Sequence, residues 1–297
     1  MASVLITGTS TGIGLATALA LGRTGHKVHA TMRDPVRSPE LAQTVAKEGL
    51  PVTISIMDVN SDASVNDVIS DIYTRGGQID VLVNNAGVEC MGSIEELPIS
   101  DFREVMETNY FGPLRCIQAV VPHMRKRASG CIINVTSVAG RIACSPMAPY
   151  TASKWALEAL TEALAQEMKP FNVRVAMVEP GIIATSMAKR ASVPPQTEYR
   201  HVRRFAGLFE GSLKNPVPAS VVAQKILEIV DSGTWVLRHP VGPDAVPFLQ
   251  WRNAMSDAEW IEWAALDDAA WYQRVERDFG FDARPDNVLI RKRGSQG

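Results

Sequence analysis

The 297-residue chain lacks an excess of charge of either sign. It has 30 Lys and Arg residues against 32 Asp and Glu residues, a formal net charge of −2, so it has no basic footprint for nucleic acid. It also lacks any apolar run near the roughly 20 residues that a membrane-spanning helix requires. We therefore expect no nucleic-acid partner and no membrane span.

Cysteine is scarce, with Cys90, Cys116, Cys131 and Cys144 as the only examples. Their spacings match no zinc or redox motif, and three of them lie in apolar contexts. A strand pattern begins at Ser3 and leaves no room for a signal peptide before it. We expect reduced thiols that fill space, no metal site and a cytoplasmic location.

What the chain does contain is a regular alternation of short apolar runs and helical patterns over residues 3–180. Such alternation predicts an α/β fold, a doubly wound parallel sheet of about seven strands with helices on both faces. No internal repeat or low-complexity linker divides the chain, so we expect one domain with appendages. The expected strands are 4–7, 28–33, 52–56, 79–83, 131–135, 172–178 and 234–238.

The first apolar run leads into a glycine-rich loop, Gly8-Thr9-Ser10-Thr11-Gly12-Ile13-Gly14, and then into a helical pattern. This is the context of a dinucleotide fingerprint, because glycines let the backbone approach a pyrophosphate at a helix N-terminus. A glycine triplet alone can also be a tight turn. Its place at the start of an alternating chain favours cofactor binding.

The end of the second expected strand bears on the choice between NADP and NAD. The position for an acid that binds the ribose hydroxyls holds Met32, and Arg33 follows it. A guanidinium suits a 2′-phosphate, to which Ser10 could add a hydroxyl, so NADP is favoured. In the alternative, Arg33 is a solvated loop charge and Asp34 serves NAD.

Three side chains that can donate or accept a proton follow in the chain. Tyr150 and Lys154 are four residues apart in a helical pattern and so share one face, while Ser137 follows a buried strand. A phenol with a pKa of about 10 is a poor acid–base group near neutrality, but a nearby ammonium would lower that pKa. Ser137 could hold the substrate oxygen. Alone, Tyr-x-x-x-Lys is more often a surface pair.

Two other stretches suit a cofactor or a ligand. Asn84-Asn85-Ala86-Gly87 close a strand where a cofactor can lie across its carboxyl end, although a turn would use the same residues. In the helical pattern over 101–127, Pro113 cannot donate to the carbonyl of Asn109. That carbonyl then needs water or a ligand, unless the proline only bends the helix.

Taken in this order and at this spacing, the motifs over residues 3–240 resemble those of the short-chain dehydrogenase/reductase family in its compact form. The resemblance implies that Tyr150 is the acid–base, that Lys154 lowers its pKa and holds the nicotinamide ribose, and that Ser137 binds the substrate oxygen. Asn109 would position a water that relays protons. Asp58 would contact adenine, and Thr185 the carboxamide. The residues expected to bind the cofactor are Gly8, Ser10, Thr11, Gly12, Ile13, Gly14, Arg33, Asp58, Val59, Asn85, Ala86, Gly87, Tyr150, Lys154, Pro180, Gly181, Ile183 and Thr185.

A narrower similarity, over residues 30–34 and beyond 235, is to the hydroxysteroid and retinol dehydrogenase branch, which acts on bulky apolar alcohols and ketones. On this basis we expect a Rossmann-fold dinucleotide-binding and catalytic domain over residues 1–239, with a substrate lid at about 181–217. The lid segment is rich in Lys and Arg. These charges either belong to an ordinary solvated surface or favour an acidic substrate or the cofactor phosphates.

A helical C-terminal extension is expected over 240–297, packed on the same domain. From Ser256 to Asp282 it has eight acids and two arginines, with Trp260, Trp263 and Trp271 at helical spacing. We expect an acidic helix with an aromatic face. Packing against the core is the simplest interpretation; covering the substrate cleft or forming an oligomer contact are the alternatives.

Together these features predict an NADP(H)-dependent oxidoreductase that interconverts a secondary alcohol and a ketone, or a primary alcohol and an aldehyde, on an apolar substrate. An NAD-dependent alcohol dehydrogenase and a non-catalytic dinucleotide sensor are the alternatives, although a sensor has no need of Tyr150. Family members commonly pair through two long helices, here 101–127 and 150–168. Because the extension would block a second interface, we expect a homodimer rather than a tetramer.

Overall fold

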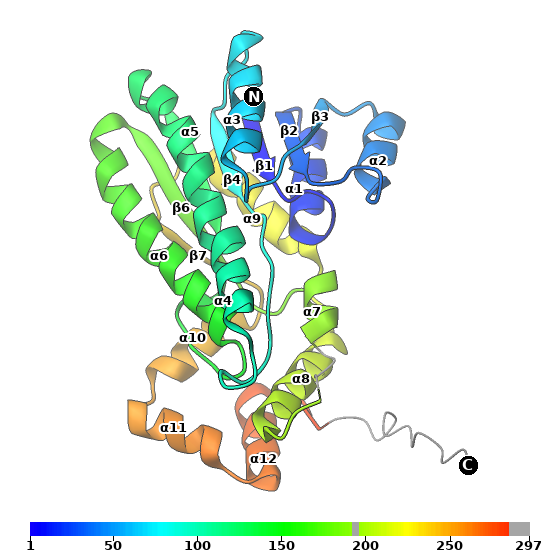
Figure 1. The fold of residues 1–297 in the computed structure, drawn as a ribbon, viewed down its shortest axis with the longest axis vertical. Helices are drawn as coiled ribbons and strands as arrows, with labels where there is room; N and C mark the ends of the chain where they lie inside the picture. Colours follow the sequence, from blue (N-terminus) through cyan, green and yellow to red (C-terminus); the bar gives the residue numbers. More distant parts are fainter. Residues whose placement is uncertain (192–195, 285–297) are drawn as a thin grey trace.

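In the computed structural model, which describes residues 1–191 and 196–284, seven parallel strands form a sheet in the order β3-β2-β1-β4-β5-β6-β7 (Figure 1). The predicted doubly wound α/β architecture is confirmed. The chain order reverses between β1 and β4, so a crevice opens at their carboxyl ends. The strands are β1 Ser3–Thr7, β2 Lys27–Met32, β3 Val52–Ile56, β4 Val81–Asn84, β5 Gly130–Val135, β6 Val173–Pro180 and β7 Arg238–Val241.

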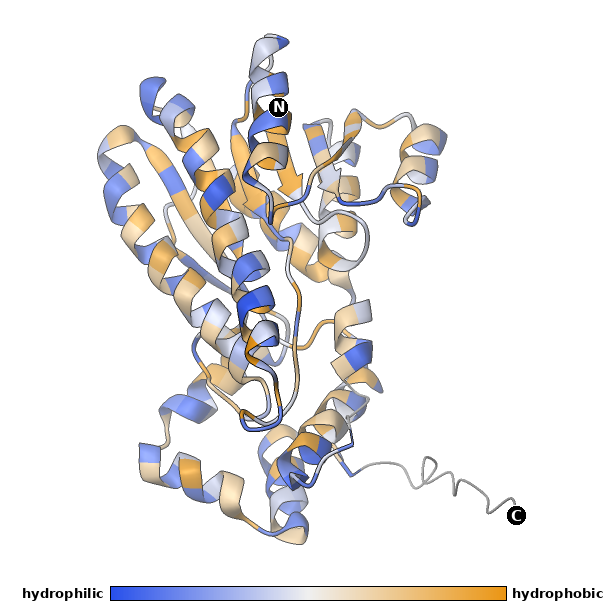
Figure 2. Ribbon diagram, in the orientation of Figure 1, coloured by the Kyte–Doolittle hydropathy of each residue, from blue (hydrophilic) through white to orange (hydrophobic). Residues whose placement is uncertain are grey.

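Helices cover both faces of the sheet, and each face has its own apolar core. One core lies between the sheet and α1, α2 and α9, and the other lies beneath α3, α5 and α6. Figure 2 shows hydrophobic residues concentrated along the strands and alternating with polar residues along the helices. The helices are α1 Gly12–Arg23, α2 Glu40–Glu48, α3 Asp62–Thr74, α4 Ile99–Met106, α5 Gly112–Lys126, α6 Ala148–Met168, α7 Ser186–Ala191, α8 Arg200–Leu213, α9 Ala219–Ser232, α10 Ala245–Asn253, α11 Asp257–Ala265 and α12 Asp268–Phe279.

Continuous apolar runs produce these strands because both faces of the sheet are covered. Val4, Leu5 and Ile6 are all fully buried, although successive side chains point to opposite faces. Val4 and Ile6 belong to one core and Leu5 to the other. The run of apolar residues that predicted β1 therefore stabilises both layers at once.

The last strand lies later in the chain than expected. The predicted strand over 234–238 is wrong, because β7 begins at Arg238 and pairs with β6 as far as Val241. In the preceding segment the N–H of Val236 donates to the hydroxyl of Thr234 at 3.1 Å. That local bond uses a backbone donor that a strand pair would otherwise take.

The long helix expected over 101–127 is interrupted by a π-helical turn. α4 leads into this turn at Glu107–Phe111, and α5 follows. Pro113 has no N–H for an α-helical bond, and the N–H of Gly112 donates instead to the carbonyl five residues earlier. π turns are frequent at functional sites, and this one contains Asn109.

Beyond β7 the chain forms α10, and the segment 256–282, expected to be an acidic helix, forms α11 and α12. Ser256 caps α11 and Asp267 caps α12, which divides the segment into two helices. Figure 1 shows α11 and α12 beside α8, beyond the carboxyl ends of the strands. Residues 192–195 of the expected lid and 285–297 of the extension lie outside the described residues. The expected boundary at residue 239 falls inside β7.

None of the described helices combines the length and the apolar character needed to cross a bilayer. All four cysteines are free. Cys131 of β5 is buried in the core under α1, α2 and α9, and Cys116 of α5 is buried in the core on the other face. Burial raises the pKa of the Cys116 thiol to about 12 and that of the Cys131 thiol to about 11. These thiols are therefore protonated near neutral pH and fill space in the core.

Candidate active site

The glycine loop joins β1 to α1 at the centre of the sheet. Gly8 and Gly12 have φ angles of 71° and 59°, and a Cβ atom on Gly14 would lie 2.2 Å from the carbonyl oxygen of Gly8. Thr11, at the N-cap of α1, makes no side-chain capping bond. The close backbone packing and the first-turn N–H groups of α1 together fit the pyrophosphate of a dinucleotide.

The end of β4 fixes this loop in place. The hydroxyl of Thr7 accepts hydrogen bonds from the N–H groups of Asn85 and Ala86, each at 3.0 Å. The Asn85 amide donates to the carbonyls of Thr7 and Gly8 at 2.9 and 3.0 Å. Asn85 was expected to bind the cofactor, and the structure uses its side chain to order the loop that forms the cradle.

The end of β2 presents a cation to the same cavity. Met32 is 3% exposed and Arg33 is exposed, and both line the cavity together with Ser10. The carboxylate of Asp34 accepts hydrogen bonds from the N–H groups of residues 36 and 37, at 3.0 and 3.2 Å. Asp34 is therefore used in a local turn.

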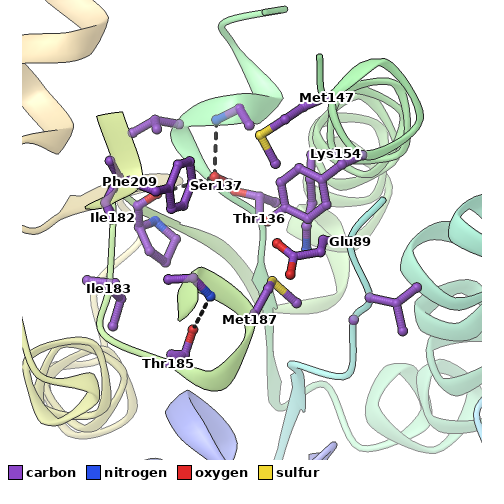
Figure 3. Close-up of a pocket in the computed structure, with 18 of the residues that line it drawn as sticks. Glu89, Thr136, Ser137, Met147, Lys154, Ile182, Ile183, Thr185, Met187 and Phe209 are labelled. Atoms are coloured by element: carbon purple, nitrogen blue, oxygen red, sulfur yellow. Dashed lines mark hydrogen bonds between the residues drawn. The ribbon is translucent and has the colours of Figure 1, made fainter. Parts of the chain in front are cut away.

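Ser137 lies at the carboxyl end of β5, where it begins a short 3₁₀ turn. Its Oγ accepts a hydrogen bond from the N–H of Ala139 at 3.1 Å and donates to the carbonyl of Pro180 at 3.3 Å. Figure 3 shows Ser137 at the cavity wall with Met147 nearby. The contact with Pro180 joins the ends of β5 and β6, so the hydroxyl is held where a substrate oxygen can reach it.

Tyr150 and Lys154 lie one turn apart on α6 and face the same cavity. The Lys154 Nζ lies 5.6 Å from the centre of the Tyr150 ring and donates to the carbonyl of Val135 at 2.9 Å. Both side chains are buried, Tyr150 at 9% and Lys154 at 5% exposure. The helix thus delivers a phenol and an amine to the carboxyl end of β5.

Burial governs the protonation of both groups. Burial raises the pKa of Tyr150 to about 12, against the effect of a hydrogen bond with Ser137. Burial also lowers the pKa of Lys154 to about 8, partly offset by the charge of Glu158. In this structure desolvation has the largest effect on the phenol, and the expected effect of the Lys154 ammonium on its pKa stays a prediction. Tyr150 is protonated at neutral pH, as a proton donor must be.

Asn109 lies behind these residues and is fully buried in the π turn. Its Nδ2 donates to the carbonyl of Val88 at 2.8 Å and to the hydroxyl of Ser153 at 3.0 Å, while its Oδ1 accepts from the N–H of Val88 at 2.8 Å. It joins the loop after β4 to α6. Asn109 and Gly14 do not line the cavity, whereas the other expected site residues do.

The cavity has a volume of about 720 Å³ and extends from the glycine loop to the lid and the C-terminal extension. Arg33 and Asp58 line it together with the glycine loop, and Tyr150 packs in one apolar cluster with Phe205 and Phe209 of α8. Beyond Tyr150 the walls are mainly aromatic and come from α8, α10, α11 and α12. These aromatic residues are Phe205, Phe209, Phe248, Trp251, Trp260, Trp263, Trp271 and Phe279.

The extension packs on the lid, and not simply on the core of the sheet as the sequence favoured. Arg204 of α8 is 2% exposed, and its Nε and Nη2 lie 2.7 and 2.6 Å from the carboxylate of Asp268. It also donates to the carbonyl of Leu266 at 2.7 Å and lies over the ring of Trp271. This lid cation is thus bound to the extension, so it is not available to an acidic substrate.

Sequence reasoning missed Glu89, which lines the cavity close to Tyr150. Its side chain is 9% exposed and lies 3.7 Å from Arg190 of α7. Burial raises the pKa of Glu89 to about 7, against the effect of Arg190. Its position in the sequence could have indicated a place near the site, because Glu89 follows the Asn-Asn-Ala-Gly segment at the carboxyl end of β4.

A glycine cradle at the switch point of a doubly wound sheet, with a Ser–Tyr–Lys group beside it, defines an oxidoreductase that uses a nicotinamide dinucleotide. The chain belongs to the short chain dehydrogenase family, whose sequence model matches residues 2–195. The fold is shared with a crystallised short-chain dehydrogenase from Streptomyces avermitilis. That structure has a TM-score of 0.77 and 31% identity, over 93% of this chain and 98% of that one.

Two curated relatives share much of this sequence. Retinol dehydrogenase 8 from Bos taurus is 42% identical over 188 residues, 62% of this chain and 59% of that protein. The match therefore spans less than two thirds of that relative. A 3-ketodihydrosphingosine reductase from Bacteroides thetaiotaomicron is 36% identical over 211 residues, 71% of this chain and 74% of that protein.

Proposed function

We propose that this protein is an NADP(H)-dependent oxidoreductase that interconverts a ketone and a secondary alcohol, or an aldehyde and a primary alcohol, on a large apolar substrate. The observation that carries this proposal is the single cavity in which Tyr150 lies between the glycine cradle and the aromatic walls of the lid and extension. In the direction of reduction, a carbonyl compound, NADPH and a proton give an alcohol and NADP⁺.

The residues of the chain act on the substrate oxygen. When bound, the nicotinamide supplies the hydride that the carbonyl carbon accepts. The Ser137 hydroxyl, which donates to the carbonyl of Pro180 in this structure, turns about its Cβ–Oγ bond to donate to the substrate oxygen instead. Tyr150 donates its phenolic proton to the same oxygen. Lys154 holds the nicotinamide ribose, and its ammonium favours the phenolate left behind. In the reverse direction the phenolate accepts the proton of the alcohol.

The residues at the end of β2 suit NADP(H) better than NAD(H). Arg33 lines the cavity, and it has no ion pair or hydrogen bond to any described residue that would compete with a 2′-phosphate. Asp34, the acid that would serve NAD, already accepts two backbone N–H groups. A guanidinium recognises phosphate geometry, whereas Met32 offers no acceptor to the ribose hydroxyls.

The apolar substrate class follows from the far end of the cavity. Aromatic side chains from the lid and extension can bury an apolar body. The two curated relatives are named for an alcohol, retinol, and for a ketone, 3-ketodihydrosphingosine. Both names are compatible with this reaction.

The proposal is tested by cofactor oxidation across a panel of ketones and aldehydes with apolar chains of increasing length. We expect kcat/KM to rise with chain length and to be higher with NADPH than with NADH. Arg33→Ala should reduce that cofactor preference about tenfold, the scale of a charged hydrogen bond, and leave the NADH rate unchanged. Lys27→Ala, which removes an exposed cation at the opposite end of β2, is the matched control.

Equal use of both cofactors by the wild type contradicts the NADP assignment. Tight NADPH binding without turnover of any carbonyl favours a sensor.

A further inference from the structure

Glu89 is a buried carboxylate that lacks a hydrogen-bond donor. Its side chain is 9% exposed, and among the described residues its Oε1 has no hydrogen-bond partner. Arg190 forms an ion pair with it at 3.7 Å, which is too long for a hydrogen bond, and is itself 65% exposed. A buried carboxylate without a donor is costly. A ligand that donates to this carboxylate would reduce that cost.

The surroundings of Glu89 restrict that ligand. Figure 3 shows its carboxylate directed into the cavity between Met187 and Ser137. Met187 belongs to an apolar cluster that includes Tyr150 and Phe209, and the charge of Glu89 acts on the Tyr150 phenol. The carboxylate therefore lies close to the Tyr150 phenol, where the reacting oxygen would bind, and has an apolar cluster on one side.

We propose that Glu89 binds a cationic amine of the substrate, carried on a carbon next to the reacting carbon, so that the substrates are amphiphilic amino ketones and amino alcohols with an apolar chain. The inference rests on the proposed function for the position of the reacting carbon. An ammonium both donates a hydrogen bond and compensates the buried charge, whereas a hydroxyl only donates. A substrate carboxylate at this place would be repelled.

Binding of an ammonium would change the protonation of Glu89. Burial raises the pKa of Glu89 to about 7, and the partial effect of Arg190 does not restore the usual value. A second cation in direct contact would favour the ionised carboxylate. The aromatic walls supplied by Trp251, Trp263 and Phe279 would then take the chain of the same molecule.

The test measures binding and does not depend on turnover. Isothermal titration calorimetry on the full chain saturated with NADPH, a form that cannot oxidise an alcohol, compares three probes. They are a long-chain vicinal amino alcohol, the corresponding diol and the corresponding plain alcohol. The wild type should bind the amino alcohol about tenfold or more tightly than either analogue, as expected for a charged hydrogen bond.

Variants assign that preference to Glu89. Glu89→Gln keeps the side-chain size and should remove the preference without changing the affinity for the plain alcohol. Glu104→Gln, an equal charge change at an exposed position of α4, should leave the preference unchanged. Arg190→Gln retains Glu89, removes its neighbouring cation, and should increase the preference. Melting temperatures establish that each variant is folded.

Several outcomes would overturn the proposal. Equal affinity for all three probes, or no binding of any, would show that the site does not recognise an amine. A diol that binds as tightly as the amino alcohol would assign Glu89 to a hydroxyl. A preference that survives Glu89→Gln would place the amine elsewhere. Failure of the proposed function is distinguishable, since it would appear as no turnover of any carbonyl compound while the binding preference persists.

Discussion

At the scale of single residues, Tyr150 is the group whose removal should isolate the chemistry from the folding. It is buried, its pKa is raised to about 12, and it lines the cavity beside Ser137. Tyr150→Phe keeps the ring and removes the proton donor. We expect the melting temperature and the cofactor Kd to remain close to wild type, while kcat falls by a factor on the order of 10² or more. Retention of most of the activity would rule out Tyr150 as the acid–base.

Lys154 sets the expected pH dependence. Burial lowers its pKa to about 8, so its amine is protonated below that pH and neutral above it. Because the ammonium holds the ribose and favours the phenolate, kcat/KM for NADPH in ketone reduction should fall as pH rises through about 8. Lys154→Met should have low turnover and weak cofactor binding at every pH. A profile that is flat across this range in the wild type would contradict the assigned role.

The residues also show where sequence reasoning stops. The glycine loop, Ser137, Tyr150 and Lys154 could be predicted because each lies at a strand end or a helix start with fixed spacing. The position of Glu89 after the Asn-Asn-Ala-Gly segment places it near the site, but its burial depends on α7 meeting the loop after β4, which no local pattern reports. The raised pKa of Tyr150 likewise depends on burial that no local pattern reports.

At the scale of elements, the contact between α8 and the extension forms one wall of the cavity. Arg204→Ala removes the buried guanidinium that holds Asp268 and the carbonyl of Leu266. We expect faster amide hydrogen exchange in α8 and α12, unchanged exchange in the strands, and a KM for long apolar ketones raised about tenfold while kcat changes little.

The neighbouring residue provides the matched control for this prediction. Arg203 lies on the same helix and is exposed, so Arg203→Ala should change neither the exchange nor the KM. If Arg204→Ala gave wild-type exchange in α12, the lid and the extension would be held together by their apolar cluster alone.

Element boundaries were less predictable than element types. Apolar runs predicted the central strands because both faces of the sheet bury them. The apolar run before β7 was misleading, since the N–H of Val236 bonds there to the hydroxyl of Thr234 and not to a neighbouring strand. The acidic segment was predicted as helical, but its division by the caps at Ser256 and Asp267 and its packing on α8 depend on tertiary contacts.

At the scale of the whole molecule, we predict a homodimer formed through α6. Ala152, Ala159 and Ala163 are exposed along this helix, and Trp155 is 49% exposed beside them. Small side chains permit close approach of a second helix. α10 packs against β7, the edge strand near which a second interface would form. Light scattering at micromolar concentration should give a dimer mass, and Ala159→Arg a monomer. A stable tetramer would show that the extension does not block the second interface.

The central claim is that Tyr150 and a bound nicotinamide reduce the carbonyl of an apolar substrate in this cavity. The most direct test is transfer of deuterium from NADPH labelled at the reactive position of the nicotinamide to a long-chain ketone, with the product analysed by mass spectrometry. We predict one deuterium atom on the carbinol carbon with the wild type and almost no labelled alcohol with Tyr150→Phe in the same time. Absence of labelled alcohol with the wild type across the whole ketone panel, or equal labelling by the two proteins, would contradict the account.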